Sequence, residues 1–238
     1  MRQLAPERRR EIVRDGIAVG IATGAYGISF GAISVTSGLD VWQTCALSLL
    51  VFTGASQFAL VGVVGAGGAP MFGAITGLLL GARNTLYGLK LAPMLGWSGV
   101  RRAAAAQLVI DESTAMSVLR ENNEAARVGF LSTGIGVFVF WNLATLIGAI
   151  AGDQMGDPRT YGLDAAVGAA FLALIWPRLR DGLNRACALL AAAVALALVP
   201  VAPAGVPVLA AGSVALLLGL RPRAHVDPTE IPEPEDLP

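Results

Sequence analysis

Charged residues are scarce in this sequence: they make up 14% of its 238 residues, whereas hydrophobic residues make up 55%. Soluble domains carry about 25% charged residues, so this chain has too few charges to cover the surface of a soluble protein. Its positive and negative charges balance to a formal net charge of zero, which provides no general attraction to nucleic acid. We therefore expect no nucleic-acid partner.

Histidine and cysteine are almost absent. The one histidine, His225, lies in the C-terminal tail, and the two cysteines, Cys45 and Cys187, lie in apolar segments. Free thiols are expected there rather than a disulfide. A metal site needs a cluster of such ligands, and Ser56 has no histidine to activate it as a nucleophile. The sequence thus predicts no metal, no cofactor and no enzymatic activity.

Long runs without any charge are what the chain has instead. Four of them contain 24, 42, 25 and 35 residues, at 16–39, 41–82, 128–152 and 186–220. Because a helix needs about 20 apolar residues to cross a bilayer, the two longest runs can each hold two spans. The sequence predicts an all-α, polytopic transmembrane helical bundle of about seven or eight spans, some of them broken or re-entrant.

The charges that are present divide the chain into three parts: a cytoplasmic segment 1–15, a transmembrane domain 16–220 and a tail 221–238. The first part has five arginines against three acids, which favours the cytoplasmic side. Its apolar continuation exceeds a signal-peptide core of about 7–15 residues, so we expect an uncleaved first helix. Arg221 and Arg223 place the acidic, proline-rich and disordered tail in the cytoplasm as well.

Seven spans follow from the apolar pattern, at 16–37, 42–64, 71–94, 128–151, 161–176, 186–199 and 206–220. Residues 103–119 are either a further span, with Gln107, Asp111 and Thr114 on one face, or part of a re-entrant excursion over 70–120. The arginine-rich loop at 178–185 requires an even number of crossings before it. The first reading gives six crossings and the second gives four, and we favour the first.

Glycines recur along the first span at a spacing close to four residues: Gly16, Gly20, Gly24, Gly27 and Gly31. Small residues at this spacing allow two helices to approach closely. The alternative is a helix that breaks near 24–31 beside a cavity. We favour simple packing.

Ionisable residues at membrane depth are the candidates for function. Arg83, Tyr87 and Lys90 share one helix face, and Asp111, Glu112 and Asp164 are the carboxylates of the apolar region. They either pair with one another for stability or form a site, because an intramembrane charge usually faces a protein interior or a watery cavity. Arginine binds a carboxylate with two prongs, which favours a transporter of a small carboxylated solute. Ser56 and Gln57 either join helices or line its path.

Four stretches follow one another along the chain: GISFGAISVTSGLDVWQTCALSLLVFTGASQF, LLLGARNTLYGLKLAP, IDES and YGLDAAVGAAFLAL. Taken in this order, they resemble proteins of the AzlC family, the large subunits of bacterial branched-chain amino acid exporters. The resemblance covers about residues 16–220. Gly81 and Asn84 depart from the family pattern, which usually has asparagine and histidine there, and asparagine cannot titrate near neutral pH.

The resemblance implies proton-driven export of valine, leucine and isoleucine, with methionine as a further candidate, across a bacterial inner membrane, with both termini cytoplasmic. It also implies a small AzlD-type membrane subunit as partner, with a homo-oligomer left open. On this reading the substrate meets Ser56, Gln57, Arg83, Asn84 and Tyr87, while Asp111, Glu112 and Asp164 couple protons. A transporter or channel for another small organic anion is the alternative, and a non-transporting membrane subunit ranks below both.

Overall fold

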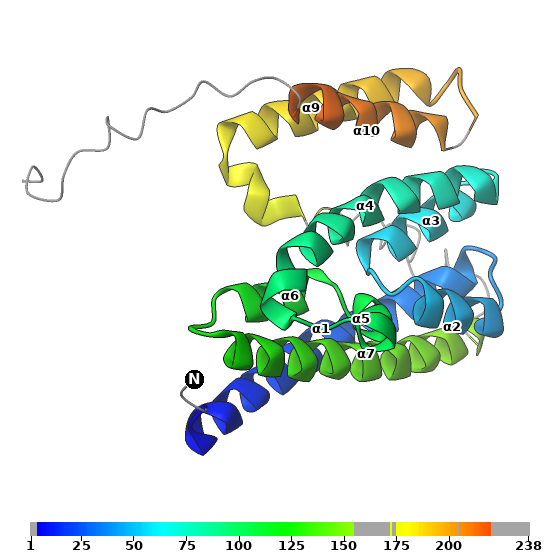
Figure 1. Cartoon of the computed structure of the whole chain (residues 1–238). Helices are drawn as coiled ribbons and strands as arrows, with labels where there is room; N and C mark the ends of the chain where they lie inside the picture. Colours follow the sequence, from blue (N-terminus) through cyan, green and yellow to red (C-terminus); the bar gives the residue numbers. More distant parts are fainter. Residues whose placement is uncertain (1–3, 155–171, 173–174, 204, 220–238) are drawn as a thin grey trace, which may run out of the picture.

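A computed structural model describes residues 4–154, 172, 175–203 and 205–219. The described residues form α-helices and one 3-10 helix, without strands. Figure 1 shows them in layers, with α1 and α7 side by side at the bottom, α3 and α4 above them, and α9 and α10 at the top. The helices, in chain order, are α1 (Pro6–Thr36), α2 (Val41–Leu50), α3 (Ala55–Gly65), α4 (Pro70–Leu95), α5 (Gly99–Ala106), α6 (Asp111–Val118), α7 (Asn123–Gln154), η2 (Trp176–Arg180), α9 (Gly182–Leu198) and α10 (Val206–Gly219).

The most extensive contact between two helices of the described chain is that of α1 with α7, and the glycines of α1 make it possible. A Cβ atom on Gly20 would collide with the backbone of Gly136 and Val137, and one on Gly31 would collide with the backbone around Thr145. The packing interpretation of the glycine spacing is therefore confirmed. The alternative of a break near residues 24–31 is wrong, because α1 is continuous over 31 residues.

The second predicted span, 42–64, is the one that breaks. It consists of α2 and α3, joined by an extended turn that ends at Gly54 with φ 64° and ψ −84°. The fully buried Gln57 holds this turn: its Oε1 accepts the Gly54 N–H at 3.0 Å, and its Nε2 donates to the Leu47 carbonyl at 3.3 Å. Helices of 10 and 11 residues are each too short to cross a bilayer.

A helix over the predicted span 71–94 is confirmed by α4, but a single helix over residues 103–119 is wrong. That region forms two eight-residue helices, α5 and α6, separated by residues 107–110. Gln107 caps the end of α5, where its Nε2 donates to the Leu49 carbonyl of α2 at 2.8 Å. Gln107 and Thr114 thus do not share a helix face, whereas the re-entrant excursion over 70–120 stays a prediction.

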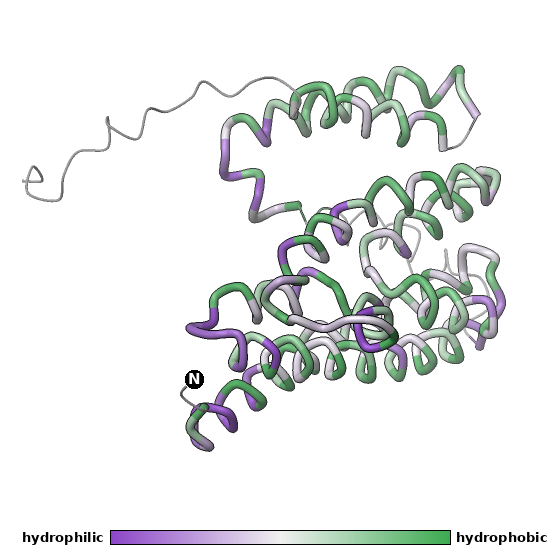
Figure 2. Tube along the Cα trace, viewed as in Figure 1, coloured by the Kyte–Doolittle hydropathy of each residue, from purple (hydrophilic) through white to green (hydrophobic). Residues whose placement is uncertain are grey.

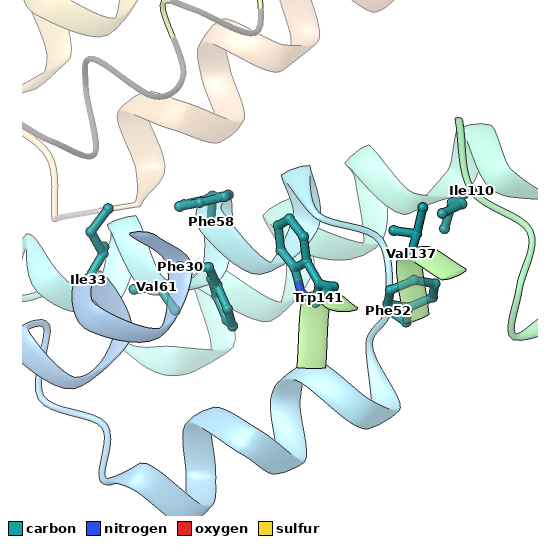
Figure 3. Close-up of a cluster of buried hydrophobic side chains, with 8 residues drawn as sticks. All are labelled: Phe30, Ile33, Phe52, Phe58, Val61, Ile110, Val137 and Trp141. Carbon is teal, nitrogen blue, oxygen red and sulfur yellow. The ribbon is translucent and has the colours of Figure 1, made fainter. Parts of the chain in front are cut away.

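The core lies where α1, α3 and α7 meet, and it is built on three aromatic rings (Figure 3). Trp141 of α7 stacks on Phe30 of α1 at 6.0 Å between ring centroids, and Phe58 of α3 meets both rings edge-on. Each ring is at most 5% exposed. Since offset and edge-on pairs contribute about 0.5–1.5 kcal/mol beyond burial, this cluster fixes how the three helices are placed.

The outer surface is apolar along the helices. Figure 2 shows hydrophobic colour over much of α4, α9 and α10, while hydrophilic colour gathers at the start of α1, the α6–α7 turn and η2. Large side chains such as Leu78, Leu86, Leu189 and Leu196 are 66–75% exposed. Among the described residues, α1 and α7 are long and apolar enough to span a membrane. The predicted span 161–176 lies almost entirely outside the described residues.

Candidate functional site

An ion pair inside the bundle joins two of the predicted residues. Arg83 of α4 donates from Nη2 to Oδ2 of Asp111, the first residue of α6, at 2.6 Å. The two side chains are 29% and 42% exposed, so the pair is partly buried. Tyr87, one turn after Arg83 on α4, interacts with the same carboxylate. The sequence placed these groups on different segments, and the fold brings them together.

The ion pair lies in the wall of a cavity of about 230 Å³. Side chains from α1, α3, α4, α6 and α7 meet there with the turn that separates α2 from α3. Its volume is below the ~300 Å³ at which pockets for drug-sized molecules begin, which fits a small metabolite. The polar lining consists of Thr23, Tyr26, Thr53, Arg83, Asp111 and Glu112, and the apolar lining includes Phe52, Phe58, Ile110, Val137 and Trp141.

Four polar atoms of this lining are buried without a hydrogen-bond partner among the described residues: Arg83 Nε, Asp111 Oδ1, Thr53 Oγ1 and Trp141 Nε1. A buried polar atom that lacks a partner costs about 1–3 kcal/mol. Such a concentration on one cavity is therefore expensive unless the cavity is filled. These atoms offer two donors, a hydroxyl and a carboxylate oxygen to a bound polar molecule.

Glu112 adds a second carboxylate beside Asp111. It lines the cavity and interacts with Thr23 of α1. No lysine or arginine of the described chain lies within the 4.0 Å limit of an ion pair with Glu112. The ionisable groups of the lining are therefore one guanidinium and two carboxyls.

Two helices begin at the cavity. Ala55 starts α3 and Asp111 starts α6, and both residues line it. The first N–H groups of a helix have no partner within the helix and carry partial positive charge. The break between α2 and α3 at Gly54 is what exposes the N-terminus of α3 at this depth. The arrangement can thus offer backbone donors beside Arg83.

The remaining predicted residues lie elsewhere. Ser56 and Gln57 are buried at the start of α3 but are not part of the cavity lining, and Ser56 packs against Gly77 and Gly81 of α4. Asn84 lines a second, more open cavity of about 760 Å³, where its Oδ1 is buried without a partner in the described chain. Lys90 is exposed on α4. Asp164 lies outside the described residues.

Phe52 and Thr53 line both cavities, so the turn between α2 and α3 forms the wall between them. Phe52 is 5% exposed and packs edge-on against Phe138 of α7 at 5.0 Å. The sequence analysis assigned no role to Phe52 and Phe138. It also assigned none to Thr23 and Trp141. Thr23 directly precedes Gly24, which packs against α7. This position next to a helix contact was the one sign in the sequence that Thr23 could face the interior.

Relatives of this chain are membrane proteins. A Helicobacter pylori protein described as an uncharacterized membrane protein is 25% identical over 172 residues, which cover 71% of this chain and 75% of the relative. An Archaeoglobus fulgidus protein with the same description is 31% identical over 172 residues, covering 71% and 74%. No solved structure matches the chain significantly.

The apolar helical surface, the charged cavity and these relatives together define an α-helical membrane protein. The family described as AzlC protein matches residues 18–155, which is more than half of the chain and includes α2 to α6. The chain belongs to the AzlC family. The matched region contains every described residue of the small cavity that comes from α3, α4, α6 and α7.

Proposed function

We propose that this protein is the membrane subunit of a transporter that exports the branched-chain amino acids valine, leucine and isoleucine, with methionine as a further candidate cargo. The observation that supports it best is the small cavity built on a broken helix, with Arg83 and Asp111 paired in its wall. Transporters commonly bind solutes near the membrane midplane where a helix is interrupted. A substrate carboxylate would bind Arg83 and the N-terminal amides of α3.

Proton coupling is assigned to the carboxyls, Asp111 and Glu112, with Asp164 as a third candidate. In the cavity lining two carboxyls lie beside the single guanidinium of Arg83. The charged form of one of them is therefore less stable, and that carboxyl takes up a proton more readily while no substrate is bound. Alternating access then links proton and substrate movement, with rearrangement at the turn between α2 and α3.

The proposed setting is a bacterial inner membrane with both termini in the cytoplasm and a small AzlD-type subunit as partner. In Figure 1 the start of α1, the α6–α7 turn and η2 lie at the same end of the helices. Arginines concentrate there, including Arg8, Arg9, Arg120, Arg178 and Arg180. The positive-inside rule assigns that end to the cytoplasm. We propose no enzymatic activity.

A transporter for another small organic anion is the second candidate, and Asn84 is the observation that favours it. Its unpartnered Oδ1 in the larger cavity can hydrogen-bond a solute but cannot carry a proton near neutral pH. A path lined this way differs chemically from one lined by histidine. The cargo or the coupling of this chain would then differ from those of its relatives.

Efflux from cells preloaded with branched-chain dipeptides tests the proposal. The protein is expressed alone, with its AzlD-type partner, and as Arg83→Ala with that partner. We expect faster export of valine, leucine or isoleucine only when both wild-type subunits are present. Export at the background rate, with both subunits verified in the membrane, would reject the branched-chain cargo.

A further inference from the structure

The pairing of Arg83 with Asp111 uses only part of each group. The contact joins Nη2 to Oδ2, although a guanidinium and a carboxylate can form two parallel bonds. Arg83 Nε and Asp111 Oδ1 remain buried without partners among the described residues. A donor on a cation and an acceptor on an anion are thus both available in one cavity wall.

The charges of the cavity lining do not balance, because the carboxylates outnumber the guanidinium. Arg83 is one positive charge against the two carboxylates Asp111 and Glu112, and no lysine or arginine in the described part of the chain forms an ion-pair contact with Glu112. A simple anion would neutralise Arg83 but increase the excess of negative charge. A molecule that carries an ammonium beside its carboxylate would satisfy both sides, because buried charges require a partner.

We propose that Asp111 and Glu112 bind the ammonium group of the substrate while Arg83 binds its carboxylate, so that the cavity selects α-amino acid zwitterions over carboxylic acids of the same shape. This inference rests on the proposed function and adds the groups that recognise the substrate. Both charges of an α-amino acid are attached to one carbon. The carboxylate and the ammonium of one molecule can therefore bind at the same time to Arg83 Nε and Asp111 Oδ1, which belong to one ion pair.

Trp141 supplies an independent indication that a polar ligand occupies this cavity. The side chain is 4% exposed and lines the cavity, and its Nε1 donor has no acceptor in the described structure. Tryptophan N–H groups usually find a partner when buried. A substrate carboxylate between Arg83 and Trp141 would accept both donors, which leaves the ammonium for the carboxylates on α6.

The opposite lining is apolar and suits the rest of the molecule. Phe52, Phe58, Ile110 and Val137 contribute hydrocarbon to a cavity of about 230 Å³. A branched aliphatic side chain gains by leaving water for such a wall. Selection of the zwitterion is thus assigned to the charged lining, and selection of the side chain to the apolar one.

Equilibrium binding to the purified full-length protein with its partner subunit in lipid nanodiscs tests this assignment. Calorimetry compares each amino acid with the same molecule lacking the ammonium: leucine with 4-methylpentanoate, alanine with propanoate, and phenylalanine with 3-phenylpropanoate. For any pair in which binding is detected, we expect the amino acid to bind about 10- to 150-fold more tightly than its deaminated acid. This is the range for a hydrogen bond to a charged group.

Glu112→Gln is the informative variant because it keeps size and hydrogen bonding but removes the charge. It should reduce the preference for the amino acid at least about tenfold while leaving the deaminated acid unchanged. Glu7→Gln is the matched control, since it removes one carboxylate from the exposed first turn of α1. A role of Glu112 in proton coupling alone would leave the preference intact in this gradient-free measurement.

The outcomes separate this inference from the proposed cargo. If alanine or phenylalanine shows the preference and leucine does not bind, the branched-chain cargo is wrong and the zwitterion assignment stands. Equal or tighter binding of the deaminated acids overturns the assignment, as does the absence of binding by all six compounds. An unchanged preference in Glu112→Gln and in Asp111→Asn would also overturn it.

Discussion

Arg83 and Asp111, which are 28 residues apart, form a single-contact ion pair between α4 and α6 with 2.6 Å between Nη2 and Oδ2. The pair joins a long helix to the start of a short one. It lies in the wall of the cavity that we assign to the substrate. Its two roles, in structure and in binding, can be separated by mutation.

Arg83→Lys tests the need for a planar guanidinium. Lysine keeps the charge but has one compact ammonium in place of a fork, so it cannot bind Asp111 and a substrate carboxylate from different edges. We expect transport to fall at least about tenfold with normal membrane expression. The measurement is dipeptide-loaded efflux normalised to the amount of protein. Normal transport by this variant would remove Arg83 from the site.

Exchanging the charges separates stability from function. The double variant Arg83→Asp with Asp111→Arg retains an ion pair, whereas either single variant leaves two like charges facing each other. Because both side chains are partly exposed, we expect a modest loss of about 1 kcal/mol in the single variants and recovery in the double variant. Transport should stay lost in all three. Thermal unfolding in detergent measures the first quantity and efflux the second.

The residues of this ion pair were predictable one by one, and pairing among such charges was one of the two alternatives, but the sequence did not show which carboxylate pairs with Arg83. Charges within uncharged runs identified Arg83 and Asp111 as residues at membrane depth. The contact between them depends on how residues 97–127 fold. There the spacing of Gln107, Asp111 and Thr114 predicted one helix, although residues 107–110 separate the two helices α5 and α6. Spacing alone cannot show where a chain turns. Polar residues three or four positions apart can lie on one helix face, but they can equally lie on two helices with a loop between them.

The long helices were the easier part. The uncharged run at 128–152 falls within α7, and all but the last three residues of the run at 16–39 fall within α1, since a bilayer-length apolar run has few alternatives to a helix. The break at Gly54 was hidden because Val51, Phe52 and Thr53 are uncharged and apolar enough to continue the pattern. Thr23 and Trp141 were missed for a related reason, since both are ordinary residues of an apolar helix until the fold directs them to a cavity.

Close packing of α1 on α7 predicts that Gly20→Ala is destabilising. The new Cβ would meet the backbone of Gly136 and Val137, which has no freedom to rotate away. We expect a loss of about 1–3 kcal/mol, the usual cost of overpacking. Gly88→Ala on α4 is the control because a Cβ there meets nothing within 4 Å. It should leave stability equal or raise it by about 0.5–1 kcal/mol. Thermal unfolding of both variants in one detergent gives the comparison, and equal melting would contradict the contact.

The turn between α2 and α3 predicts a large effect at Gln57. This side chain is fully buried and bonds the Gly54 N–H and the Leu47 carbonyl. Gln57→Leu keeps a similar volume but leaves the Gly54 N–H without its acceptor, at about 1–3 kcal/mol. The Leu47 carbonyl loses the Gln57 donor but still accepts the Val51 N–H at 2.9 Å. We expect lower yield and a lower melting temperature. Gln43→Leu is a control because Gln43, also in a capping box, is exposed at the start of α2. A Gln57 variant that melts like the Gln43 variant would show that the turn is held by other contacts.

Trp141→Phe separates the two roles of the largest residue in the cavity. Phenylalanine retains a ring that can stack on Phe30 and meet Phe58 edge-on, but it has no Nε1 donor. If Nε1 binds the substrate, affinity should fall about 10-fold or more, with a much smaller change in melting temperature. Phe140→Leu, at the neighbouring and 37% exposed position of α7, is the control for general damage to this helix. Loss of stability at Trp141 with unchanged affinity would make the indole a packing residue only, and the carboxylate of the substrate would then depend on Arg83 and the amides of α3.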